Sequence, residues 1–206
     1  MKNYILLLLV AMSSLCMSAQ KRGDMQYGFN LGLNMTNMKV SSLSIGAGET
    51  KYSFNAAGLL EYYFDSQWSI KGKLILDNKG WENQLYQVDG NSFGDATAHF
   101  TYVTVPLMAG FHFGNAKNFY LNYGFYSGFL VNAKIDDTNV KEYFNEVDFG
   151  LCYGAGAKFD INKNTTFFIE YQSQSGVYNI ANESQASSTV KNRRHGINFG
   201  FLFDVY

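Results

Sequence analysis

The sequence predicts an all-β fold, an eight-stranded antiparallel up-and-down barrel that spans a membrane. Three observations support this prediction: long segments in which apolar and polar residues alternate, connections of alternating length, and few charges (16%) beside 20 Gly, 18 Phe and 15 Tyr. A side-chain period of two is typical of a strand whose two faces meet different environments. The segments also reach the roughly 9–11 residues that a tilted strand needs to cross a bilayer.

The clearest pair of strands lies in the middle of the chain, at 101–113 and 119–134. In the second strand Phe119, Leu121, Tyr123 and Phe125 alternate with polar or small residues. Between the two strands, the sequence Gly-Asn-Ala-Lys-Asn is typical of a turn. The other expected strands are 26–37, 52–64, 68–79, 147–160, 165–178 and 193–205.

The expected connections alternate between short and long. The short ones are 65–67, 114–118 and 161–164, and the long polar ones are 39–51, 80–100, 135–146 and 179–192. Short turns on one side and long loops on the other, with both chain ends on the short-turn side, indicate an outer-membrane barrel. A rigid barrel displays variable loops at little cost, so the four long loops are the expected elements for binding a protein partner.

Residues 1–19 have the features of a cleaved secretory signal peptide. Lys2 precedes a short apolar stretch, and Ala19 stands before the expected cut at Gln20. Cys16 suggests a lipoprotein signal as an alternative, but the residue before it is not one that such signals use. The barrel domain is then 20–206. It keeps one cysteine, Cys152, so it cannot form an internal disulfide.

The clear mid-strand charges are ten, and all of them fall on the polar face: Glu61, Lys71, Lys73, Asp77, Lys134, Asp148, Lys158, Glu170, Arg194 and Asp204. The interior of an eight-stranded barrel is just wide enough for side chains to fill it, and buried charges need partners. The sequence therefore predicts a lumen charge network that includes Glu61, Lys71, Lys73, Asp148, Glu170 and Arg194. The turn at 65–67 places Glu61 directly opposite Lys71. A small porin-like channel is the alternative.

Aromatic residues flank the short turns and the chain ends on the apolar face. They are Tyr27, Phe64, Trp68, Phe113, Phe119, Phe159, Phe167 and Phe203. Aromatic rings are favoured at the headgroup level of a membrane, so this set predicts a girdle at the periplasmic interface. A soluble lipocalin also has alternating strands, but with its apolar face inward. Against that alternative, ten charges inside a lipocalin cup would face an apolar ligand without solvation.

Several segments resemble the PorT-like outer-membrane β-barrel family of Gram-negative bacteria. They are spread over the mature chain, at residues 28–34, 73–80, 102–108, 124–130, 148–151 and 154–156. Pro106-Leu107 and Asp148-Phe149-Gly150 are the more specific pieces, while Thr104 stands where the family commonly has Glu. The resemblance implies an eight-stranded barrel in the outer membrane. It implies little chemistry, because most members have no assigned activity, and the namesake's link to protein secretion is analogy alone.

Two sets of polar residues at the loop end of the expected barrel are candidate sites. Asp89, Ser92, Asp95 and His99 lie in the longest loop, but Phe93 occupies a ligand position of the calcium-loop pattern that begins at Asp89. We therefore expect no enzyme activity, no metal and no cofactor, with an enzyme at the outer rim as the alternative.

The second group is Arg193, Arg194 and His195, at the outer end of the last strand. These residues either contact anionic lipid headgroups or form a solvated strand end. With a net charge of −1, the chain gives no reason to expect nucleic acid as a partner, and membrane lipid is the expected surrounding.

Overall fold

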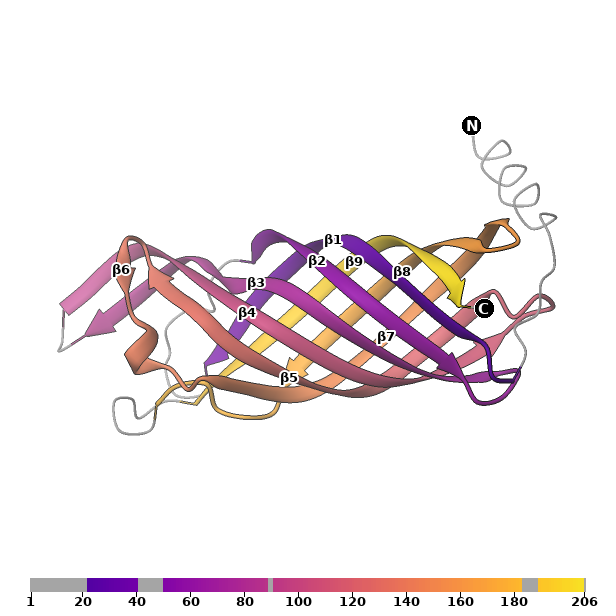
Figure 1. Ribbon diagram of the computed structural model, residues 1–206. Coiled ribbons are helices and arrows are strands. Elements are labelled where there is room, and N and C mark those ends of the chain that lie inside the picture. Colours follow the sequence, from indigo (N-terminus) through magenta and orange to yellow (C-terminus); the bar gives the residue numbers. More distant parts are fainter. Residues whose placement is uncertain (1–21, 41–49, 89–90, 183–188, 206) are drawn as a thin grey trace, which may run out of the picture.

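A computed structural model describes residues 22–40, 50–88, 91–182 and 189–205; side chains are described except at 38–40, 83–88 and 91–96. The predicted signal peptide and the centres of two expected loops, 41–49 and 183–188, lie outside these residues. In the described part, eight long antiparallel strands close into one barrel (Figure 1). The fold prediction is therefore confirmed. None of the described helical residues forms a helix long and apolar enough to cross a membrane.

The eight long strands follow one another around the barrel in chain order. They are β1 (Met25–Val40), β2 (Lys51–Tyr63), β3 (Trp68–Val88), β4 (Asn91–Phe113), β5 (Phe119–Ile135), β7 (Val147–Asn162), β8 (Thr165–Gly176) and β9 (Val190–Val205). A two-residue strand, β6 (Thr138–Asn139), folds back on the end of β5 and is followed by the short helix η1 (Lys141–Tyr143). β1 pairs with both β2 and β9, which closes the barrel.

The register fixes the stagger of the barrel. Following paired residues from Tyr27 in β1 through β2, β3, β4, β5, β7, β8 and β9 leads back to β1 at Asn37, ten positions further along. Such a stagger over eight strands requires a tilt of roughly 40°. The outward residues of β1 from Tyr27 to Met35 are all at least 40% exposed. This apolar stripe is about 26 Å long along the strand, which at that tilt corresponds to a height of roughly 20 Å, close to the lipid-facing band of roughly 25 Å in such barrels.

The prediction of a long loop at 80–100 is wrong, because β3 and β4 continue through it. They remain paired out to Val88 and Asn91, with bulges between Trp81 and Tyr86. In Figure 1 this hairpin is the part that projects furthest at the loop end. The sequence contains the signal for it: Asp89-Gly90 is a typical two-residue hairpin turn. The polar residues of this segment make it resemble a loop, but they belong to a hairpin outside the membrane.

The predicted inward position of Lys134 is also wrong. A β-bulge in β5 places both Val131 and Asn132 against the step from Tyr102 to Thr101 in β4. One extra residue inverts the alternation that follows it. Ala133 and Ile135 consequently face inward and are buried, while Lys134 is exposed.

Candidate functional site: the lumen and its outer cap

The lumen of the barrel holds most of the charges that the sequence assigns to it. Eight of the ten are buried: Glu61, Lys71, Lys73, Asp77, Asp148, Lys158, Glu170 and Arg194. Asp204 is half-buried at the periplasmic end, and Lys134 lies outside the lumen. The buried charges form two clusters, so the six residues of the predicted network do not all meet at one place.

The lower cluster lies toward the short turns and has two carboxylates at its centre. Lys158 Nζ donates to Glu61 Oε2 at 2.8 Å, and Lys71 Nζ lies 3.4 Å from the same oxygen. Glu170 accepts from Lys73 and lies 3.4 Å from Lys71 Nζ. Lys71 therefore bridges both carboxylates, while each of the other two lysines serves one. The register places Glu61 opposite Lys71, as the turn at 65–67 predicts.

Neutral groups complete the lower cluster. Glu170 Oε2 also accepts from Tyr120 OH at 3.1 Å and from Asn122 Nδ2 at 3.0 Å. Lys158 contacts Tyr63 OH and donates to Gln26 Oε1 at 3.1 Å. The Tyr120 ring lies 4.0 Å from Lys71 Nζ, a cation–π contact. Glu61, Glu170, Lys71 and Lys158 each have several partners, which is the condition under which buried charges are tolerated.

Ser69, His112 and Glu61 meet beside this cluster and resemble a catalytic triad in composition only. Ser69 Oγ donates to Glu61 Oε1 at 2.8 Å and lies 3.0 Å from His112 Nε2. His112 Nε2 also lies 3.1 Å from Glu61 Oε1. In a Ser–His–acid triad, the acid and the serine contact opposite ring nitrogens. Here both contact the same nitrogen, and all three side chains are fully buried.

The upper cluster lies toward the loops and consists of two ion pairs. Arg194 Nε lies 3.1 Å from Asp77 Oδ1, and Lys79 Nζ lies 2.9 Å from Asp148 Oδ2. Tyr126 OH donates to Asp148 at 3.1 Å. Asparagine side chains lie between the two clusters: Asn55 Nδ2 donates at 2.7 Å to Asn34, which donates to Asp77 at 2.9 Å. Polar groups thus occupy the lumen from one cluster to the other.

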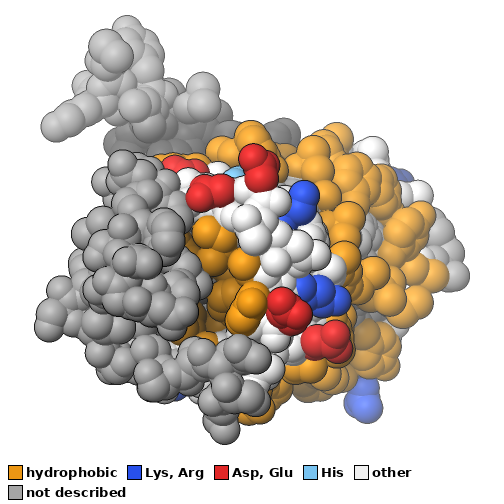
Figure 2. Space-filling model, turned by 90° about the vertical axis from the view of Figure 1, so that its left-hand side faces the viewer, with side chains coloured by type: hydrophobic (Ala, Val, Ile, Leu, Met, Phe, Trp, Pro, Cys, Tyr) orange, Lys and Arg blue, Asp and Glu red, His pale blue; other side chains and the backbone are white. Residues whose placement is uncertain are grey.

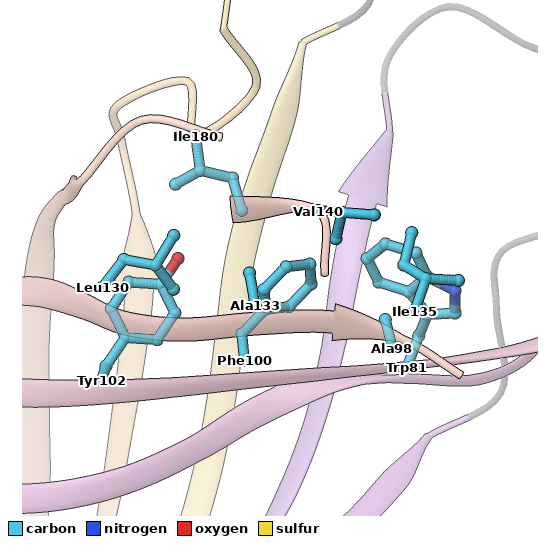
Figure 3. Close-up of a cluster of buried hydrophobic side chains, with 9 residues drawn as sticks. All are labelled: Trp81, Ala98, Phe100, Tyr102, Leu130, Ala133, Ile135, Val140 and Ile180. Atoms are coloured by element: carbon cyan, nitrogen blue, oxygen red, sulfur yellow. The ribbon is translucent and has the colours of Figure 1, made fainter. Parts of the chain in front are cut away.

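An apolar cluster closes the lumen above the upper ion pairs. It consists of Trp81, Ala98, Phe100, Tyr102, Leu130, Ala133, Ile135, Val140 and Ile180, with Phe144 and Val190 packed against it (Figure 3). We call it the outer cap. Val140 and Phe144 come from the segment that follows β6, and Ile180 comes from the segment after β8. The Phe144 ring packs edge-on against Phe100 at 4.7 Å. Two connecting segments therefore fold over the mouth of the barrel.

The outer surface of the cap has a hollow of about 730 Å³, and its lining residues are Asn139, Lys141, Glu142, Phe144, Asn145, Glu146 and Asn182. Asn145 Nδ2 donates to the backbone oxygens of Asn179 (2.9 Å) and Ala181 (3.1 Å), which joins the two cap segments. Viewed from this end, acidic and basic side chains lie among hydrophobic and uncharged ones (Figure 2). The hollow therefore presents amides, carboxylates and one ammonium group to the outside.

His99 is the only member of the loop group Asp89, Ser92, Asp95 and His99 whose side chain the structure describes. Its Nδ1 lies 2.6 Å from Lys51 Nζ, which also donates to Ala98 O at 2.8 Å. Gly80 has a φ of 138° and allows Ala98 O to come close to its backbone, because a Cβ at residue 80 would lie 2.0 Å from that oxygen. Lys51 lies beyond the apolar stripe, and burial lowers its pKa to about 8. Among described residues, no cluster of three or more His, Cys, Asp or Glu could hold a metal ion.

The eight aromatic residues of the expected girdle face outward around the short-turn end of the barrel. Tyr27, Phe64, Trp68, Phe113 and Phe119 are 40–50% exposed, and the other three are half-buried. Neighbouring rings contact one another across strand pairs, as in Tyr27–Phe203 (5.6 Å) and Phe159–Phe167 (6.3 Å). Phe111, which the sequence analysis does not include, joins this belt beside Trp68 at 4.9 Å.

Sequence reasoning missed Lys79 in the lumen and the whole outer cap, and it did not include His112 in the charge network. Lys79 continues the inward alternation of Lys71, Lys73 and Asp77, so extending the parity by two residues would have found it. His112 lies on the polar face of its strand, but the network was drawn from Lys, Arg, Asp and Glu alone. No signal in the sequence marks Val140 or Ile180 as lumen residues, because they reach the lumen from connecting segments rather than from the barrel strands.

Comparison with known proteins agrees with this architecture. Residues 18–182 match the family model described as "Outer membrane protein beta-barrel domain". No curated protein matches the sequence. The structure is similar to the crystal structure of the outer membrane protein OprG from Pseudomonas aeruginosa, with a TM-score of 0.58 and 12% identity over 91% of this chain and 98% of that one. It is also similar to the solid-state NMR structure of the outer membrane protein AlkL in DMPC lipid bilayers, with a TM-score of 0.52 and 11% identity over 91% and 92% of the two chains. At such identities the likeness concerns the fold.

Proposed function

This chain belongs to the outer membrane protein β-barrel domain family, and we propose that it is a closed barrel of structural or interaction type, without enzyme or channel activity. The lumen is a packed plug, and the outer connections are the elements that bind a partner. Within the broad family, we assign it to the PorT-like group on the segments quoted above. Its export requires a cleaved signal peptide at residues 1–19, and it resides in the outer membrane of a Gram-negative bacterium.

The observation that carries this proposal is the arrangement of the lumen in layers. The lower ion cluster, the asparagine layer, the upper ion pairs and the outer cap follow one another along the barrel axis. An ion that crossed the barrel would have to separate Glu61 from Lys158 and Asp148 from Lys79, in a region where water cannot replace the lost partners. The cap adds an apolar barrier, which is unfavourable for a charged solute.

Planar-bilayer recordings test the proposal. Purified full-length mature protein, with its folded state checked by heat-modifiable gel mobility, should give no steady conductance at neutral pH. A variant with the cap polar residues intact but with Val140→Asp and Phe144→Asp should also stay closed, because the ion clusters below remain. Reproducible single-channel steps from the wild-type protein would favour the porin-like alternative. Steps from the cap variant alone would locate the barrier at the cap.

The interaction part of the proposal concerns the connections at 39–51, 135–146 and 179–192 and the projecting hairpin 80–100. Contacts of the cap residues hold the described parts of the second and third connections, 135–146 and 179–182, against the barrel mouth, so the exposed side chains of these parts have defined positions. A fixed surface loses little conformational entropy on binding. Exchange of Lys141, Glu142 and Glu146 for Ala should leave the unfolding midpoint unchanged and reduce attachment of cells to a partner-coated surface.

The enzyme alternative requires a reactive group at the outer rim. Among the described rim residues, the side-chain hydrogen-bond partner of His99 is Lys51. Incubation of the pure protein in micelles with ester, peptide and phospholipid substrates, beside a His99→Ala variant, tests this alternative. Turnover that disappears in the variant would replace the interaction function by an enzymatic one.

A further inference from the structure

Three basic residues form an outward-facing row on β9, at its outer end. The alternation of this strand directs Arg194 into the lumen and Arg193 to the outside, where Arg193 is exposed. Lys191 and His195 share the outward parity of Arg193 and are half-buried. The group that the sequence suggested, Arg193, Arg194 and His195, is therefore divided by the barrel wall. Arg193 and His195 face the outside of the barrel, and Lys191 completes the outward-facing row.

The row lies at the upper edge of the lipid-facing surface. Register places His195 beside Met35, which in turn pairs with Tyr52, and those two side chains are 40% and 71% exposed. Below the row, the same face of β9 carries Ile197 and Phe199, both exposed. Lys191 lies four residues beyond His195, or roughly 13 Å along the tilted strand, which spans the roughly 5–8 Å of one headgroup layer. The row thus extends from the apolar band into the headgroup region.

Among the described residues of the strands around the row, no acidic side chain faces outward beside it. In the described β1, β8 and β9, the acidic residues are Glu170, which is buried in the lumen, and Asp204, which lies at the periplasmic end. With the described residues, neither Lys191 nor Arg193 forms a salt bridge. The uncharged neighbours across the strand pairs are Asn37 and Ser175, both opposite Arg193. An unneutralised basic row at a lipid interface attracts anionic headgroups.

Tyr171 holds the His195 ring in a fixed orientation. The Tyr171 hydroxyl lies 2.7 Å from His195 Nδ1, and the two rings are nearly parallel, with centroids 6.1 Å apart. Both side chains are on the outer wall of the barrel, so this contact is not part of the lumen network. An oriented imidazole presents its other ring nitrogen in a defined direction, which adds a positioned polar group to the two flexible cations above it.

We propose that Lys191, Arg193 and His195, supported by Tyr171, bind the phosphate group of an anionic lipid in the outer leaflet. Phosphate is the shared chemistry of several ligands, and Arg and Lys are its usual partners in proteins. The source is a lipid rather than free phosphate, because the row continues the apolar face of Ile197 and Phe199, against which acyl chains pack. The inference needs the placement in the membrane and does not depend on a closed lumen or on a protein partner.

Native mass spectrometry of the purified protein in dodecyl maltoside micelles tests this site. The probes are dioleoyl phosphatidic acid, which carries an anionic phosphate, and dioleoyl phosphatidylcholine, which has the same chains and no net charge. Wild-type protein should retain phosphatidic acid preferentially. The double variant Lys191→Gln/Arg193→Gln should lose affinity by roughly 25-fold, about fivefold for each charge removed. Lys163→Gln, on the exposed periplasmic turn, is the matched control and should bind like wild type.

Other outcomes would overturn the assignment. Equal retention of the two lipids by the wild-type protein, or equal loss in the Lys163 control and the double variant, would show that the row recognises no headgroup. Displacement of phosphatidic acid by an equimolar amount of inorganic phosphate would show that phosphate alone is recognised and that the lipid assignment is wrong. The variants replace outward side chains, and heat-modifiable mobility verifies that each one is folded before binding is compared.

Discussion

Removing the charge of Glu61 should be among the most destabilising single changes in the lumen. Glu61→Gln keeps the size of the side chain and one hydrogen-bonding oxygen. It leaves Lys158, whose Nζ now lies 2.8 Å from a carboxylate oxygen, without a carboxylate partner. Lys71 loses one of its two partners but keeps Glu170 at 3.4 Å. Because an uncompensated buried charge typically costs 3–5 kcal/mol, we expect a loss of about 3 kcal/mol or more in the free energy of unfolding.

Two double-mutant cycles that share Glu61 separate its partners. The first combines Glu61→Gln with Lys158→Met and the second combines it with Lys71→Met; methionine retains much of the apolar stem of lysine. The Lys158 contact is a close charge-assisted hydrogen bond, so its coupling should be about 2–3 kcal/mol. The Lys71 contact is longer and shared with Glu170, so its coupling should be about 1 kcal/mol.

Urea unfolding in phospholipid vesicles, followed by tryptophan fluorescence, measures all the proteins of both cycles. Thr101→Ala, at a half-buried position outside the lumen network, is a suitable control for general effects of mutation. Couplings within error of zero would mean that water solvates these side chains independently and that the lumen is not a packed plug. A larger coupling for Lys71 than for Lys158 would contradict the assignment of Lys71 as the bridging cation.

Three further predictions concern the barrel wall and the outer rim. Phe125→Arg, on the lipid-facing wall, should cost roughly 2–4 kcal/mol in vesicle unfolding, whereas Asn115→Arg in the exposed turn should cost almost nothing; equal midpoints would refute the orientation. In a cysteine-free background, Lys134→Cys should react with a water-soluble maleimide and Ile135→Cys should not, and the opposite result would place the bulge elsewhere. Lys51 has a pKa of about 8 in the folded protein and 10.5 as an ordinary exposed lysine, so the unfolded state binds more protons between these values. The free energy of unfolding should therefore gain a contribution as pH rises from about 8 to 10.5, which Lys51→Met should lose.

The sequence predicted the part of this fold that depends on a period of two. Strand parity determines which side chains face lipid and which face the lumen, and both sets are long enough to be recognised without an alignment. Glu61 and Lys71 could be paired across the strands because the turn between β2 and β3 is short, and a short turn fixes the register. Partners on distant strands could not be found in this way. The contacts of Glu61 with Lys158 and of Lys79 with Asp148 depend on the stagger of the closed barrel.

The outer rim was less predictable because its signals are irregular. The extension of β3 and β4 past Gly80 contains bulges, which interrupt the alternation that identifies a strand. The cap residues Val140, Phe144 and Ile180 lie in connecting segments with no period at all. Their burial follows from contacts with Phe100 and Trp81, which belong to a segment that composition alone identifies as a polar loop. A single sequence therefore gives the barrel wall in detail and its outer closure hardly at all.

The bulge in β5 connects these observations. Without the extra residue at Val131–Asn132, the alternation would continue and direct Lys134 into the lumen below the cap, with Ala133 and Ile135 toward the outside. With it, two apolar side chains enter the lumen at the level where the upper ion pairs end, and the ammonium group is solvated outside. The inserted apolar pair supplies part of the surface on which Val140 packs. One additional residue in a strand thus places two apolar side chains in the lumen instead of one charged side chain, at the level where the outer cap begins.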